Sequence, residues 1–164
     1  TQLAGTVLTS FNGAVTANPL APGLAVDLTG TAFTINSTVT TTNGGQVEIT
    51  NSGLLTIAAA GDMTLDGSFL QNGAGLTSTA GDMVTTNADI TFTTAVTLTG
   101  PVALSTGAGI GNILFSSTVN SDGAGTTRDL TLTAGTGNIT FTGAAGTTFS
   151  LMRTAREGRF PSIW

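Results

Sequence analysis

The chain has 164 residues, of which only 8% are charged, and its formal net charge is −5 at pH 7. It contains no Cys, His or Lys, which excludes disulfides, thiolate metal sites and the clustered basic surface that nucleic acid requires. No apolar run reaches the roughly 18 residues of a membrane-spanning helix. Abundant Thr, Val, Ile and Gly with so little charge predict many short strands rather than disorder.

The amino-terminal part of the sequence alternates between apolar and polar residues. Residues 1–16 alternate loosely, and a loop is expected at 18–23, where Pro19 and Pro22 remove backbone donors. From Leu24 onward the alternation is regular, in bursts of roughly three to five residues separated by turns rich in Asn and Gly. Period-two alternation of this length indicates short strands with one buried face.

A short phrase returns four times in the second half of the chain. Each copy has a small residue, an Asp or Asn, an apolar residue, a Thr or Leu, and a second apolar residue. The copies occupy residues 61–65, 88–92, 111–115 and 137–141. The spacing between copies is in the twenties, which is typical of a solenoid built from stacked coils.

Two neighbouring segments show how one coil is assembled. Residues 89–111 and 112–137 each contain three short alternating strands separated by bends. Three strands per coil predict an all-β parallel β-helix (β-solenoid) over residues 1–149, with about six to seven coils spaced about 4.8 Å apart. An antiparallel sandwich or barrel is the alternative fold, because it also has turns at short intervals.

Stacked coils place equivalent side chains above one another. Two inward columns are predicted, one of Leu65, Phe92, Phe115 and Phe141 and one of Met63, Ile90, Ile113 and Ile139. Phe69 competes with Leu65 for its column, because Asp66 also precedes the Asp89 phrase by 23 residues. A ladder of turn residues is predicted at Asp62, Asp89, Asn112 and Asn138, since Asp and Asn suit tight bends and can bond along a stack.

One pair of carboxylates suggests a metal site. Residues 60–63 and 80–83 carry the same four letters, so Asp62 and Asp82 would stack if twenty residues make one coil. Two close carboxylates favour a hard cation such as calcium. Alternatively, the two copies lie on different sides of the coil and form no site.

The last fifteen residues differ from the repeats. Residues 150–164 hold three of the four Arg and the single Trp, and a helical turn is conceivable at 151–157. We interpret this tail as a cap or subunit contact, because an open solenoid end would otherwise template aggregation. The alternative is that it is the frayed end of an excerpt.

The phrases at residues 129–135 and 137–143 resemble the repeats of filamentous-haemagglutinin-like and autotransporter-type bacterial surface proteins. The similarity covers about residues 25–149. It implies a right-handed parallel β-helix, export from the cell, and a structural or adhesive rod at the outer surface or outside the cell. It also implies partners such as other surface chains or a host or matrix glycan.

Three other functions are compatible with a solenoid. A self-assembling extracellular filament is the main alternative, with coils that stack end to end between subunits. A carbohydrate-active enzyme is less favoured, because the nine acids are scattered and no His or Lys is present for acid–base work. Ice binding through outward pairs such as Thr91 and Thr93 is also less favoured, because the pairs fall on different strands. No catalytic residue and no cofactor is predicted.

Overall fold

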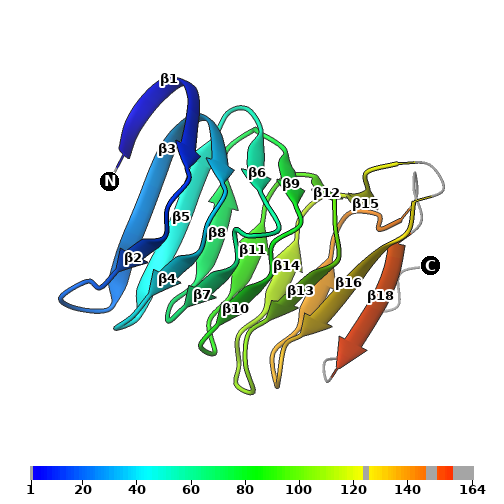
Figure 1. Ribbon diagram of the computed structural model, residues 1–164. Helices are drawn as coiled ribbons and strands as arrows, with labels where there is room; N and C mark the ends of the chain where they lie inside the picture. The colour runs from blue at the N-terminus through cyan, green and yellow to red at the C-terminus, as the bar shows by residue number, and fades with distance from the viewer. Residues whose placement is uncertain (1, 124–125, 147–150, 157–164) are drawn as a thin grey trace.

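The computed structural model describes residues 2–123, 126–146 and 151–156, with side chains for residues 7–123 and 126–146. These residues form an all-β solenoid of about six turns with roughly three strands per coil, and they include no helix. In Figure 1 the coils stack in a single row from the amino-terminal to the carboxy-terminal end. The fold class predicted from the sequence is confirmed.

The strands stack into three faces. The first face consists of β3 (Gly23–Ile35), β5 (Gly45–Asn51), β8 (Phe69–Asn72), β11 (Ile90–Phe92), β14 (Ile113–Phe115) and β17 (Ile139–Phe141). The second face consists of the later half of β3 with β6 (Leu55–Ile57), β9 (Thr77–Thr79), β12 (Val96–Leu98) and β15 (Val119–Ser121). The third face consists of β2 (Val15–Ala17), β4 (Val39–Thr41), β7 (Met63–Leu65), β10 (Met83–Thr85), β13 (Val102–Ser105), β16 (Arg128–Thr133) and β18 (Leu151–Arg156).

Every strand pair among the described residues is parallel, so the antiparallel alternative is wrong. The long strand β3 joins the first two faces into one sheet, because its first half pairs with β5 and its second half with β6. At the amino-terminal side β1 (Gln2–Phe11) pairs with β3 through a register that shifts twice. From β5 onward the strand pairs show no such register shift.

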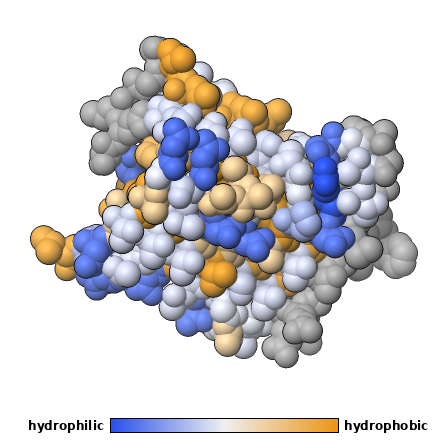
Figure 2. Space-filling model, in the orientation of Figure 1, coloured by the Kyte–Doolittle hydropathy of each residue, from blue (hydrophilic) through white to orange (hydrophobic). Residues whose placement is uncertain are grey.

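The core follows from the alternation of the strands. Most three-residue strands are buried at their first and third positions and more exposed at the second, as in β11 and β14. Outward positions carry mainly Thr, Ser and small residues, and the side of the molecule seen in Figure 2 is mostly pale, with blue and orange patches between. One continuous apolar core therefore runs through the coils.

Three phenylalanines stack along the first face. The ring centroids of Phe92 and Phe115 are 5.4 Å apart with an interplanar angle of 4°, and those of Phe115 and Phe141 are 4.9 Å apart at 12°. The strand register aligns the same residues, and it also aligns Ile90, Ile113 and Ile139 in the neighbouring column. Three members of each predicted column are therefore confirmed.

The fourth member of each predicted column is wrong. Met63 and Leu65 lie in β7 on the third face, where they pair with Met83 and Thr85. The first-face strand that precedes β11 is β8, which places Phe69 beside Ile90 and Gln71 beside Phe92. Phe69 still reaches the aromatic stack, because its ring centroid lies 5.3 Å from that of Phe92 at a tilt of 50°.

Buried threonines hold the bend between the third and first faces. Thr41, Thr85 and Thr106 are each at most 3% exposed, and their hydroxyls donate to the carbonyl oxygens of Gly45, Ala88 and Gly111. The bonds from Thr41 and Thr106 measure 2.6 and 2.7 Å. A Thr in an inward position thus satisfies the carbonyl of the bend that follows it.

Thr77 is an exception among the buried threonines. It lies between Leu55 and Val96 in the apolar column of the second face, and its Oγ1 has no hydrogen-bond partner among the described residues. We expect Thr77→Val to raise the free energy of unfolding by about 1 kcal/mol, because a buried hydroxyl without a partner is exchanged for a methyl of similar shape. Urea unfolding measures the change.

The matched control for this substitution is Thr106→Val. It removes a hydroxyl that does have a partner, so we expect it to lower stability by about 1 kcal/mol. Loss of stability in both variants would contradict the assignment of Thr77 as unsatisfied.

Glycines allow neighbouring coils to touch at the bends. A Cβ on Gly75 would overlap the carbonyl oxygen of Gly53 in the preceding coil. We expect Gly75→Ala to destabilise the chain by about 3 kcal/mol, since both backbones must shift. Gly13→Ala is the control, because a Cβ there meets nothing within 4 Å. Thermal unfolding compares the two, and equal melting temperatures would contradict close coil contact at Gly75.

The carboxy-terminal tail contributes a strand. Residues 151–156 form β18, which pairs in register with β16, so the expected helical turn is wrong for Leu151–Arg156. The solenoid thus continues past the expected boundary at residue 149. The rest of the expected turn and tail, residues 150 and 157–164, lies outside the described residues.

Candidate functional site

A ladder of Asp and Asn side chains runs up the bend before the first face. The Oδ1 of Asp89 accepts hydrogen bonds from the backbone N–H of Asn112 at 2.7 Å and from its side-chain Nδ2 at 3.0 Å. The Oδ1 of Asn112 accepts in the same way from Asn138, at 2.9 and 3.4 Å. Each side chain thus fixes the bend of the next coil.

Asp62 does not belong to this ladder, which corrects the prediction. The register of β8 with β11 places Ser68 below Asp89 in the preceding coil. Asp62 precedes β7 and therefore lies at the bend that leads into the third face. The same residue pattern occurs at both bends, because each bend leads into a strand whose first and third residues point inward.

Asp62 and Asp82 form a second, shorter ladder. The register of β7 with β10 stacks them one coil apart, so the alternative that they lie on different sides is wrong. The Oδ1 of Asp62 accepts from the N–H of Asp82 at 2.8 Å, and the Oδ1 of Asp82 accepts from the N–H of Ala103 at 2.7 Å. One oxygen of each carboxylate therefore holds a backbone donor of the next coil.

The candidate cation site at this pair gains no third acidic, histidine or cysteine ligand among the described residues. Calcium takes about six to eight oxygen ligands. Within residues 7–123 and 126–146, no group of three or more His, Cys, Asp or Glu side chains comes together around a common centre. The pair is better described as a turn ladder than as a metal centre.

A surface groove lies beside the first ladder. Its volume is about 340 Å³, and its lining comes from the bends and first-face strands of three successive coils. The lining residues are Asp89, Thr91, Asn112, Ile113, Leu114, Asn138 and Thr140. The groove is half open to solvent and combines carboxylate, amide, hydroxyl and aliphatic groups.

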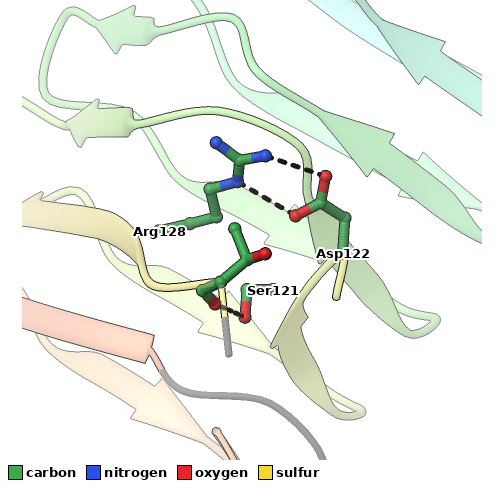
Figure 3. A network of polar contacts seen from close by, with 4 residues as sticks. Ser121, Asp122 and Arg128 are labelled. Carbon is green, nitrogen blue, oxygen red and sulfur yellow. Dashed lines mark hydrogen bonds and ion pairs between the residues drawn. The ribbon is translucent and has the colours of Figure 1, made fainter. Parts of the chain in front are cut away.

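One ion pair joins the bend after the second face to the third face. Arg128 donates to Asp122 through Nε at 2.9 Å and through Nη2 at 3.0 Å, as Figure 3 shows. The adjacent Asp129 is not its partner, because neighbouring residues in a strand point to opposite sides. The Arg128 hydrogen bonds hold the pKa of Asp122 below its ordinary value of 3.8.

This pair predicts a pH dependence. A carboxyl whose pKa is lowered by folding stabilises the folded state above its unfolded pKa, and this stabilisation is lost as the pH falls through the folded pKa. We expect the wild type to lose more stability than Asp122→Asn between pH 7 and pH values below 3.8. The effect is small because both side chains are 30% exposed. Urea unfolding at the two pH values measures it, and equal losses would contradict the pairing.

A buried polar network at the bend after the first face was not predicted from the sequence. Gln71 is fully buried, and its Nε2 donates to Asn51 Oδ1 at 2.8 Å, to the Asn72 carbonyl at 3.0 Å and to the Gly75 carbonyl at 3.2 Å. Its Oε1 accepts from the backbone N–H groups of Thr93 and Thr94 at 3.2 and 3.3 Å. The sequence signal that could have revealed this network was a Gln at an inward position of an alternating segment.

The outward threonine pairs fall on different faces, as predicted. Thr91 and Thr140 lie on the first face, Thr97 on the second, and Thr131 on the third. On the second face, however, the strand register places four outward residues in one column, which the sequence did not reveal: Thr34, Thr56, Ser78 and Thr97.

A comparison of this chain with protein-family models, curated proteins and solved structures found no match. The described part of the chain offers no helix that could span a membrane. The function must therefore be inferred from the solenoid and its side chains.

Proposed function

We propose that this chain is a structural and adhesive rod of a bacterial surface or the extracellular space, and that it is not an enzyme. The observation that carries the proposal is the continuous stack of coils, in which each strand pairs with the equivalent strand of the next coil on the same face. In such an array each coil supports its neighbour, so the rod holds its shape along its axis. A binding surface can then be presented away from the point of attachment.

The carboxylates support a structural assignment. Asp62, Asp66, Asp82 and Asp89 each accept a backbone N–H from a neighbouring coil. A carboxylate held in this way is fixed in position by the backbone of the neighbouring coil. These hydrogen bonds support a structural role for the four acids.

Labelling of intact cells tests the proposed location. We expect antibodies against the purified chain to label unpermeabilised cells of the source organism or their surrounding matrix. Labelling that requires permeabilisation would contradict the proposal. For adhesion, beads coated with the chain should attach to cells or matrix more than beads coated with albumin, and product release from a panel of polysaccharides should be absent. Equal attachment or measurable hydrolysis would contradict it.

A self-assembling filament is the second candidate. Among the described residues, β2 and β18 are the outer strands of the seven-stranded sheet and run in the same direction. Parallel outer strands allow a second copy to continue the sheet head to tail. Electron microscopy of dilute protein separates the candidates, because only the filament predicts rods that lengthen with concentration.

A further inference from the structure

The groove beside Asp89 has polar atoms that remain free for a ligand. Asp89 uses Oδ1 for both bonds from Asn112, and its Oδ2 takes part in neither. Thr91 and Thr140 lie at the outward positions of β11 and β17, and their hydroxyls have no hydrogen-bond partner among the described residues. Three oxygen atoms on one side of the groove can therefore bond to hydroxyl groups.

An aliphatic side chain lies between these hydroxyls. The strand register places Leu114 between Thr91 and Thr140 on successive coils. Leu114 is partly exposed and lines the groove. The resulting strip alternates hydroxyl, aliphatic and hydroxyl groups. A pyranose ring matches such a strip, because it carries C–H groups on its faces and hydroxyls at its rim.

The spacing of the strip favours a chain of sugars. Equivalent residues on neighbouring strands are about 4.8 Å apart. A pyranose ring with its glycosidic oxygen spans nearly the same distance. Successive sugars of a linear chain lying along the solenoid axis would therefore meet Thr91, Leu114 and Thr140 in turn, and the Asp and Asn ladder would line one edge of the chain.

The charges around the groove select among polysaccharides. Arg128 is the only cation whose side chain the structure describes, and Asp122 already holds it. Asp89 lines the groove itself, while Glu48 and Asp27 lie two and three coils before Thr91 in the same outward column of the first face. Uronate or sulfate groups in the groove would be repelled chiefly by Asp89, and by Glu48 where a longer chain extends toward it. An uncharged chain meets no such repulsion.

We propose that this groove binds a linear, uncharged polysaccharide that lies along the axis of the solenoid. The Thr91 and Thr140 hydroxyls and the Asp89 carboxylate bond to sugar hydroxyls, and Leu114 packs against a ring. This assignment rests on the proposed function, since it names the class of ligand for an adhesive rod.

Affinity electrophoresis tests the proposal. The purified chain is run through native gels that contain xyloglucan, galactomannan, mixed-linkage β-glucan or alginate. We expect retardation by at least one neutral polysaccharide and none by alginate. The double variant Thr91→Val/Thr140→Val should bind the retarding polysaccharide about tenfold more weakly, because two hydrogen bonds are lost while the side-chain shape is kept. Asp89→Asn should also weaken binding.

Two controls lie outside the groove. Thr97→Val changes an outward Thr of the second face, and Asp82→Asn changes a ladder carboxylate that also holds a backbone N–H. Both should bind as the wild type does. The proposal is overturned if no neutral polysaccharide retards the chain, if only alginate does, or if groove and control variants behave alike. The surface-labelling and bead-attachment experiments do not depend on these results. They test the proposed function separately from the groove.

Discussion

Phe115→Ala is expected to lower the free energy of unfolding by about 5 kcal/mol. Phe115 is 1% exposed, and its truncation leaves a cavity at the centre of the core, which alone costs about 3–5 kcal/mol. Its ring also stacks on both Phe92 and Phe141, and each aromatic pair adds about 0.5–1.5 kcal/mol. Urea unfolding followed by circular dichroism measures the loss.

Phe33→Ala separates burial from stacking. Phe33 is also fully buried, but it lies in the second face with Leu55 as its strand neighbour and not in the aromatic stack. We expect its truncation to cost about 1–3 kcal/mol less than that of Phe115. Equal losses would show that the stacked rings contribute nothing beyond the area they bury.

Gln71→Leu is expected to destabilise the chain by about 3 kcal/mol, although leucine fits the apolar column better. The strand register places Gln71 between Ile49 and Phe92, where its neighbours are apolar. Its amide nevertheless donates to the Oδ1 of Asn51 and accepts from the N–H of Thr94, and both groups lose this partner in the variant. Each buried group left without a partner costs about 1–3 kcal/mol.

Gln46→Leu is the matched control, because Gln46 is exposed at the start of β5 and its change should stay within about 0.5 kcal/mol. Thermal and urea unfolding of both variants give the comparison. A more stable Gln71→Leu protein would show that the groups at the bend find other hydrogen-bond partners and that the network does not hold the first and second faces together.

The sequence was most informative where the repeats are regular. The alternation in residues 90–92, 113–115 and 139–141 predicted both the parallel stack and the columns of Phe92, Phe115 and Phe141. The Asp89, Asn112 and Asn138 ladder followed from the same spacing. Period-two alternation decides which residues face inward, and a constant coil length decides which residues stack.

The sequence was misleading where coil length varies. The step between equivalent residues is 20 from Met63 to Met83, 23 from Ile90 to Ile113, and 28 from Leu104 to Leu132, as the register shows. With such variation a shared phrase does not reveal its face, so Met63 and Leu65 were assigned to the wrong columns. Gln71 was missed because its partners come from bends in three coils, which no local pattern brings together.

The amino-acid sequence by itself determined that this chain winds into stacked parallel coils, because alternation and repeat spacing are local properties that survive in the linear order of residues. Only the tertiary structure decided which of the three faces each strand joins, since loops of different length between strands set that choice. It alone brought Asp89, Thr91, Leu114 and Thr140 into one groove, because a shared groove requires the register between coils and not only the pattern within them.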